Sequence, residues 1–449
     1  MLLKNLQKIV IFLMVFLFVV EVNSQGYFRL KDEVKKTVVP FKMLSNLVIF
    51  PIEVNGKELN FILDSGVGVT VLFNLNPNDS INLKNVSKIQ LQGLGQEEPV
   101  DAILSENNLF RLKNITGYNQ KLYVIFDDSF DLSSKLGITI HGIIGYNILK
   151  DFVVNINYTS KRLTFYKHEA YKFKNCKSCE VLNLHFDKLK PFVDVQVKLK
   201  PHSEEKTQVK LLIDSGGSDA MWLFENSHPD ILPPKKYFKD YLGEGLSGSI
   251  YGKRSFIEAL YIGKYEFKRP TISYPDSASV AFARRFEERN GSIGATVLKR
   301  FSVTFNYKDS ILILRKGKYF NDPFRYNMSG IELAHNGKIL VQEKDETSYT
   351  LADTQNSSER NKIIIDYNYK YTFKPSYIIQ NLREGSPAYD AGLRKGDIVI
   401  KIDGSYTYDM DLDEIVEKFY QNENTRVKLL VERNGQDYEY SFKLRDMLK

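Results

Sequence analysis

The feature that most constrains this sequence is an apolar stretch ending in Asp-Ser-Gly, which occurs twice. Residues 61–66 read Phe-Ile-Leu-Asp-Ser-Gly, and residues 211–216 read Leu-Leu-Ile-Asp-Ser-Gly. A buried strand that ends on a carboxylate is costly to form, because the anion loses its hydration unless it is paired or neutralised. Two such strands in one chain predict that the carboxyl groups of Asp64 and Asp214 meet.

Each copy is followed by the same two landmarks in the same order. The first is a Gly-rich segment, which contains Gly93 and Gly95 in one copy and Gly245 and Gly248 in the other. The second is an apolar-apolar-Gly turn, in which Gly145 follows Asp64 by 81 positions and Gly294 follows Asp214 by 80. An internal repeat of this kind predicts two lobes of similar architecture.

The repeat resembles the pepsin and retropepsin-like aspartic peptidases over about residues 45–316. The resemblance implies a mainly β, bilobal acid-protease fold with a pseudo-twofold axis, with lobe 1 at 45–166, a linker at 167–190 and lobe 2 at 191–316. It implies that Asp64 and Asp214 are catalytic and that one flap hairpin per lobe covers the cleft. The residues that would support the acid loops are Ser65, Gly66, Ser215, Gly216, Gly145 and Gly294.

Two departures from the family pattern concern substrate handling. The residue after the triplet is Val67 in one copy and Gly217 in the other, where the family has a small or hydroxylic residue. The first Gly-rich segment lacks the tyrosine of pepsin-like flaps, but Tyr251 lies near the second. We therefore expect the flap and substrate residues to be Gly93, Gly95, Gly245, Gly248 and Tyr251.

Two adjacent carboxyl groups give a defined chemistry. They cannot both ionise cheaply, so one pKa rises and the pair shares a proton. The ionised member can activate a water, and the protonated member can polarise the scissile carbonyl. This mechanism needs no cofactor and no metal. The six dispersed histidines form no Ser-His-Asp or His-Glu-x-x-His pattern, which argues against serine hydrolases and metalloproteases.

The C-terminal part, 321–449, resembles a PDZ domain of the bacterial secreted type. The signature runs through Ser386-Pro387-Ala388, Ala391-Gly392-Leu393 and Gly396-Asp397-Ile398. We expect a helix from Asp411 to about Tyr420, a polar insertion near 341–362, and peptide binding by strand addition at Tyr377, Ile378 and Ile379. The partner would be a protein C-terminus or an extended peptide.

The N-terminus predicts export. Lys4 and Lys8 precede an apolar run over 9–20, and small residues end the segment at Ser24. This is the form of a signal peptide at 1–24, since the run is shorter than the roughly 18 apolar residues of a membrane span. The mature protein would be periplasmic or extracellular, with no membrane span after cleavage.

Cys176 and Cys179 are the two cysteines of the chain. A redox dithiol would need a strand-to-helix context, and a zinc site would need two more ligands. A structural disulfide in an oxidising compartment is the preferred interpretation, and the redox and zinc readings stay open as alternatives.

The net charge of +7 comes from scattered lysines and arginines, with no basic stripe, so no nucleic-acid partner is expected. Two lobes in one chain predict a monomer. Either the protein is an aspartic-type endopeptidase with a PDZ domain for peptide binding, or it is a catalytically silent adaptor or sensor built on the same fold. The pattern also predicts a helix over 277–289 and a surface position for Asp219.

Overall fold

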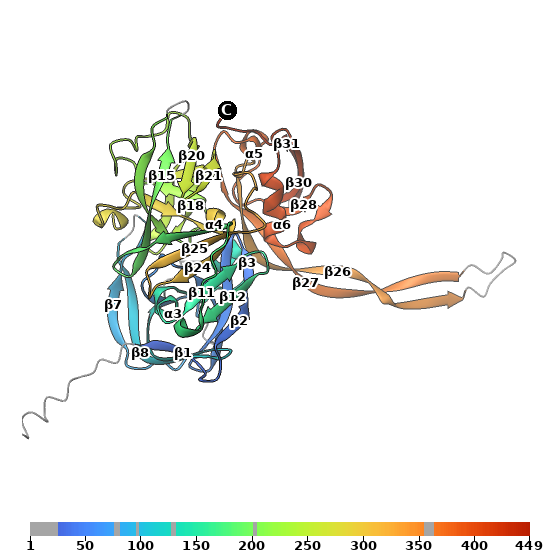
Figure 1. The fold of residues 1–449 in the computed structure, drawn as a ribbon. Coiled ribbons are helices and arrows are strands. Elements are labelled where there is room, and N and C mark those ends of the chain that lie inside the picture. The colour runs from blue at the N-terminus through green and yellow to red at the C-terminus, as the bar shows by residue number, and fades with distance from the viewer. Residues whose placement is uncertain (1–25, 76–80, 96–97, 127–131, 201–203, 354–362) are drawn as a thin grey trace, which may run out of the picture.

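The computed structural model describes residues 26–75, 81–95, 98–126, 132–200, 204–353 and 363–449. The fold is mainly β, with two lobes, a sheet shared between them and a C-terminal domain (Figure 1). The signal peptide predicted at 1–24 lies outside the described residues. Within these residues, no helix is long and apolar enough to cross a membrane.

Lobe 1 is a nine-stranded sheet in the order β1-β9-β6-β10-β5-β4-β8-β7, with β3 paired to β4. Strand β5 ends directly before Asp64, and β10 runs parallel to it with Ile144 beside Leu63. The strands are β1 (Tyr27–Leu30), β3 (Lys42–Leu44), β4 (Leu47–Val54), β5 (Lys57–Leu63), β6 (Thr70–Leu72), β7 (Ser87–Leu91), β8 (Val100–Leu112), β9 (Ile115–Ile125) and β10 (Gly142–Ile144).

Lobe 2 repeats this plan in a ten-stranded sheet, ordered β18-β19-β22-β17-β23-β16-β15-β20-β21, with β14 paired to β15. Strand β16 ends directly before Asp214, and β23 runs parallel to it with Ile293 beside Ile213. The strands are β14 (His185–Asp187), β15 (Lys190–Lys198), β16 (Thr207–Ile213), β17 (Met221–Leu223), β18 (Phe238–Gly245), β19 (Gly248–Phe256), β20 (Ala259–Ile262), β21 (Tyr265–Lys268), β22 (Thr271–Pro275) and β23 (Gly291–Ile293).

A six-stranded sheet joins the lobes in the order β13-β25-β24-β11-β12-β2. At its centre, Val153 of β11 pairs with Asn306 of β24, so the two lobes share backbone hydrogen bonds. One cluster of buried apolar residues runs through both lobes. The strands are β2 (Lys36–Pro40), β11 (Val153–Asn157), β12 (Arg162–Tyr166), β13 (Cys179–Asn183), β24 (Phe301–Asn306) and β25 (Ile311–Lys316).

The segment 167–190 does more than link the lobes. It supplies β13 to the shared sheet and β14 to lobe 2, and it contains a disulfide between Cys176 and Cys179. The predicted disulfide is therefore present, and the compartment stays a prediction. The disulfide closes the turn that leads into β13.

Helices are short and few among the described residues. They are α2 (Leu132–Leu136), α3 (Tyr146–Leu149), α4 (Ala295–Leu298), α5 (Pro387–Asp390) and α6 (Leu412–Glu417), with 3-10 turns η1 (His168–Ala170), η2 (Ala283–Arg285), η3 (Thr407–Asp409) and η4 (Lys418–Tyr420).

The predicted helix over 277–289 is wrong, because the structure has only η2 there. Val280 and Ala283 are buried against Phe224, and their spacing of three suits a 3-10 turn. Phe286 has an extended backbone, and its ring packs on Phe192 with centroids 5.0 Å apart. The apolar pattern is therefore explained by turns packed on lobe 2, without a regular helix.

The C-terminal domain has its own core and a sheet in the order β26-β27-β28-β30-β31, with β29 paired to β28. The predicted helix is present as α6 followed by η4, and Asp411 and Glu414 form its capping box. The strands are β26 (Ile331–Asp353), β27 (Ile363–Leu382), β28 (Ile398–Ile402), β29 (Ser405–Tyr406), β30 (Arg426–Arg433) and β31 (Gln436–Lys443).

The polar insertion near 341–362 is not an irregular loop over its described part. Strands β26 and β27 continue into it as a two-stranded ribbon that projects from the body of the molecule (Figure 1). Lys344 pairs with Tyr369, and Gln342 pairs with Tyr371. The polar composition of this segment did not indicate strands, although the tyrosines and Phe373 of β27 favour an extended backbone.

Candidate active site

Asp64 and Asp214 occupy the same place in their lobes. The backbone N–H of Asp64 donates to the carbonyl of Ile144, and that of Asp214 donates to Ile293, both at 2.9 Å. Each acid is thus held where its strand ends by the parallel neighbouring strand. Both side chains are partly exposed at the junction between the lobes.

The two carboxyl groups meet. They share a side-chain hydrogen bond, and a methyl group placed on Gly66 would lie 3.1 Å from an oxygen of each. A methyl group on Gly216 would lie 2.2 Å from Cγ of Asp64. Glycine at 66 and 216 therefore lets each loop approach the opposite carboxyl group.

Ser65 and Ser215 exchange hydrogen bonds across the lobe interface. The hydroxyl of Ser65 donates to the carbonyl of Ile213 at 2.6 Å, and that of Ser215 donates to Leu63 at 2.8 Å. Each hydroxyl also accepts from the backbone N–H of the other serine at 3.0 Å. Both serines are fully buried, so this symmetric network fixes the two acid loops at one level.

Backbone donors hold each carboxylate, but in unequal number. Asp64 accepts from the N–H of Gly66 at 2.7 Å. Asp214 accepts from Gly216 at 3.1 Å and Gly217 at 2.9 Å. Since such bonds favour the ionised form, the loop around Asp214 stabilises a negative charge better.

The pKa of Asp64 is raised well above its usual range. Burial is the main cause, and repulsion by Asp214 adds to it. The N–H of Gly66 and the ammonium of Lys190 act in the opposite direction, lowering the pKa. The carboxyl group of Asp64 is therefore the one that burial favours as the proton carrier.

Gly145 and Gly294 pack directly beneath the acid loops. A methyl group on Gly145 would lie 2.0 Å from the carbonyl oxygen of Asp64, and one on Gly294 would lie 2.7 Å from that of Gly217. The next residues continue this support, since the N–H of Tyr146 donates to Val67 and that of Ala295 donates to Gly217. Both glycines are required by close backbone approach.

Two flap hairpins meet tip to tip. Hairpin β7–β8 belongs to lobe 1 and β18–β19 to lobe 2. At the tips, the N–H of Ser247 donates to the carbonyl of Leu94 at 2.8 Å. Methyl groups on Gly95 and Gly245 would lie 1.8 and 2.2 Å from backbone oxygens of the opposite flap. The Gly-rich segments therefore let the flaps interlock.

Each flap tip packs on the opposite lobe. Leu94 contacts the cluster around Phe224 in lobe 2, and Leu246 contacts the cluster around Ile49 in lobe 1. Tyr251 lies in the stem of the second flap, 47% exposed, with its ring against Tyr241. It is not at the interlocked tips.

Asp219 is not a surface residue, contrary to the sequence-based prediction. It accepts from Trp222 Nε1 at 2.8 Å and from Ser273 Oγ at 2.7 Å, and it pairs with Arg254 at 2.9 Å. Arg254 also pairs with Asp240. The acid is therefore part of a half-buried network that anchors the stem of the second flap.

The prediction that Tyr377, Ile378 and Ile379 receive an added peptide strand is wrong. All three pair with β26, through His335, Ala334 and Leu333, and Ile378 also pairs with Ile398 of β28. A strand with neighbours on both sides cannot accept another. The outer edge of this sheet is β26, and α6 packs against it.

Lobe 1 reaches the space beside that edge. Helix α2 contacts β26, and a methyl group on Gly137, directly after α2, would lie 4.0 Å from His335 and 3.8 Å from Leu412 of α6. Lys135 of α2 also donates to Glu244 of the second flap at 2.6 Å. One short helix therefore contacts the C-terminal domain and a flap.

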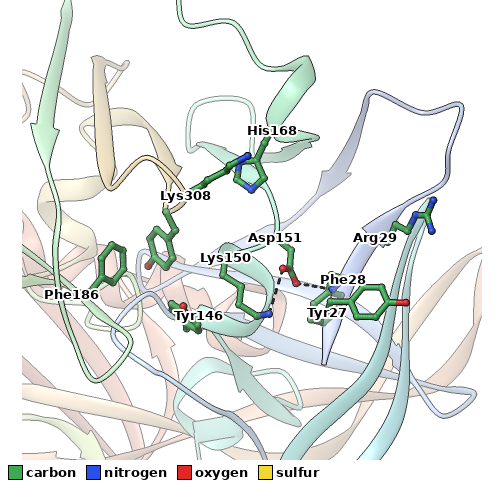
Figure 2. A pocket seen from close by; sticks show the side chains of 10 residues that line it. Tyr27, Phe28, Arg29, Tyr146, Lys150, Asp151, His168, Phe186 and Lys308 are labelled. Atoms are coloured by element: carbon green, nitrogen blue, oxygen red, sulfur yellow. Dashed lines mark hydrogen bonds and ion pairs between the residues drawn. The ribbon is translucent and has the colours of Figure 1, made fainter. Parts of the chain in front are cut away.

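A cavity of about 470 Å³ is lined by ten residues, among them Tyr27, Tyr146, Asp151 and Lys308 (Figure 2). Its aromatic side is formed by Tyr146, Phe186 and Tyr307, whose ring centroids lie 4.8–6.5 Å apart. Lys150 and Asp151 also line the cavity, and Asp151 accepts a hydrogen bond from the N–H of Phe28. The hydroxyl of Tyr307 is buried, and the charge of Asp64 contributes to raising the pKa of Tyr307. This aromatic cluster therefore lies close to Asp64.

Among the described residues, no cluster of three or more His, Cys, Asp or Glu side chains is arranged to hold a metal ion.

Comparison with known proteins agrees with this geometry. Residues 50–148 match the aspartyl protease family, and residues 378–433 match the PDZ domain family. A search of curated proteins gave no match. The chain therefore contains an aspartyl protease domain and a C-terminal PDZ domain. The first match lies within lobe 1, and the pairing of lobe 2 with it rests on the structural repeat described above.

Proposed function

We propose that this protein is an aspartic-type endopeptidase that hydrolyses peptide bonds in the cleft between its lobes. The observation that carries the proposal is the contact of two carboxyl groups held level by the reciprocal bonds of Ser65 and Ser215. Such a pair shares one proton, which is the arrangement required for acid and base catalysis by one site.

In this mechanism, Asp64 carries the proton and Asp214 is the base. Burial raises the pKa of Asp64, and Asp214 accepts two backbone N–H bonds. Asp214 removes a proton from a water, which attacks the scissile carbonyl, while Asp64 donates its proton to the carbonyl oxygen. As the C–N bond breaks, Asp214 passes its proton to the leaving amine, and Asp64 takes a proton back from a hydroxyl of the intermediate, which restores the pair.

The interlocked flaps would close over a bound peptide. A closed site excludes bulk water and strengthens the electrostatic interactions around the developing charge. Because the tips bond to one another through Leu94 and Ser247, entry of a peptide requires them to separate.

The C-terminal PDZ domain supplies peptide binding, and we place its ligand at the free edge of β26 beside α6. Export to the periplasm or the extracellular space is also part of the proposal. The disulfide between Cys176 and Cys179 supports it, since such bonds persist in oxidising compartments.

The test is peptide cleavage by the exported chain, compared with Asp64→Asn and Asp214→Asn. Each variant should lower kcat by about 10³-fold or more, because each removes one half of the proton exchange. Asp32→Asn, in an exposed pair with Arg29, is the control and should retain activity.

Cleavage at the wild-type rate in both dyad variants would show that Asp64 and Asp214 do not catalyse it, and would reject the aspartic-type peptidase. A wild-type chain that binds peptides and cuts none would instead identify a silent binding module.

A further inference from the structure

The first point of this inference is a pair of equivalent positions beside the two acids. In lobe 1, β4 pairs with β5, and continuing the register from Ile49 and Ile62 by one pair on the same face places Leu47 opposite Asp64. In lobe 2, the same step from Phe192 and Leu212 places Lys190 opposite Asp214. Lys190 therefore stands where lobe 1 has a buried leucine.

A second pair of positions follows the same rule. His141 and Asn290 each donate their N–H to the strand that carries the acid, to Asn60 and Lys210 respectively, both at 2.9 Å. The residues before them, Ile140 and Arg289, are thus equivalent. Ile140 is fully buried in an apolar cluster, whereas Arg289 is a cation that is 4% exposed.

The two walls of the cleft differ accordingly. On lobe 1, Leu47 and Ile140 join Ile49, Ile62 and Phe73 in one apolar cluster, which the flap residue Leu246 also contacts. On lobe 2, the guanidinium of Arg289 lies over the ring of Phe224 at 5.2 Å, and this ring contacts Leu94 of the other flap. Arg289 therefore packs against the cluster that the tip of the first flap also contacts.

The anions nearest to Lys190 and Arg289 are the catalytic carboxyl groups, together with Asp187 beside Lys190. Within the described part of the chain neither forms an ion pair, and the guanidinium of Arg289 has one hydrogen bond, from Nε to the carbonyl of Gly291. Asp187 pairs with Lys190 in backbone register, and Arg284 and Glu287 line a small cavity beside Arg289. Because the dyad shares a proton, it supplies one negative charge to two buried cations, and an acidic side chain of the substrate would supply a second.

We propose that Lys190 and Arg289 form a subsite for an acidic side chain of the substrate, next to the scissile bond. The equivalent apolar wall of lobe 1 takes an apolar side chain on the other side of that bond. The strand register puts Lys190 opposite Asp214, which places the subsite beside the dyad. This inference rests on the proposed function, and it names the substrates as peptides with one apolar and one acidic residue flanking the cut.

The experiment uses the full chain and two pairs of peptides. Within a pair, the peptides differ only in having Glu or Gln next to a leucine, and the two pairs differ in whether this residue precedes or follows the leucine. For one order, kcat/KM should be about tenfold higher for the Glu peptide than for the Gln peptide. Lys190→Met and Arg289→Met, which keep length and remove charge, should each bring this ratio close to one.

Arg284→Met is the matched control, since it removes a charge from the same loop and should keep the ratio. Thermal melting checks that each variant is folded. A Glu-to-Gln ratio of one in the wild type, or a ratio that both Met variants leave unchanged, would overturn the subsite.

Binding of the same peptides, measured by calorimetry, separates this inference from the proposed function. A chain that cleaves nothing but binds Glu peptides more tightly than Gln peptides, dependent on Lys190 and Arg289, rejects the peptidase and keeps the subsite. Cleavage without a preference for Glu peptides rejects the subsite and keeps the peptidase.

Discussion

Lobe 1 and lobe 2 agree closely at their acid loops and differ on the walls beside them. Ser65 and Ser215 make the same pair of bonds, and the N–H of each acid donates over the same distance. At equivalent positions beside the acids, lobe 1 has Leu47 and Ile140 where lobe 2 has Lys190 and Arg289. Symmetry is therefore retained where the two acids meet, and is lost on the walls beside them.

The largest effect should come from adding a methyl group between the lobes. Gly216→Ala places Cβ 2.2 Å from Cγ of Asp64, so the carboxyl group must move. We expect kcat/KM to fall by about 100-fold or more, since a displacement near 1 Å has that cost. Gly66→Ala, whose methyl would lie 3.1 Å from both carboxyl groups, should lose less. Equal losses would show that the two loops are interchangeable.

The next effect concerns stability and tests the symmetry itself. Ser65→Ala and Ser215→Ala each remove two buried hydrogen bonds and leave a backbone N–H of the other lobe unpaired. Each should lower the free energy of unfolding by about 2 to 4 kcal/mol. Denaturant unfolding measures this, and a variant that loses under half as much as its partner would contradict the reciprocal network.

The smallest effect is a shift of the pH profile. The ammonium of Lys190 lowers the pKa of Asp64, so Lys190→Leu, which installs the residue of lobe 1, should raise it. The alkaline limb of kcat/KM, where Asp64 loses its proton, should then move to higher pH, by roughly half a unit or more. Lys188→Asn is the control, because Lys188 lies two residues before Lys190 and is exposed. A shift to lower pH would contradict the electrostatic contact.

Much of the site could be predicted because its constraints are local and repeated. A strand that ends in Asp-Ser-Gly, with a turn glycine some 80 residues later, specifies Asp64, Gly145 and their counterparts before any contact is known. The disulfide and the capping box at Asp411 follow from short spacings in the same way.

The remainder depends on tertiary pairing, which spacing does not encode. Tyr377 to Ile379 read as a free strand, but their neighbours come from β26, over 40 residues earlier in the chain. Asp219 read as exposed because its partner Arg254 lies on a different strand. Lys190 was overlooked, although aligning the two repeats by their acids would have placed it beside Asp214.

The contact of α2 with the C-terminal domain has a thermodynamic consequence. A peptide that adds to β26 beside α6 meets Gly137 of lobe 1 in the same space. Its apparent affinity is then reduced by the free energy needed to displace that segment. Because Lys135 of the same segment donates to Glu244, displacing the segment would also disturb a contact of the second flap.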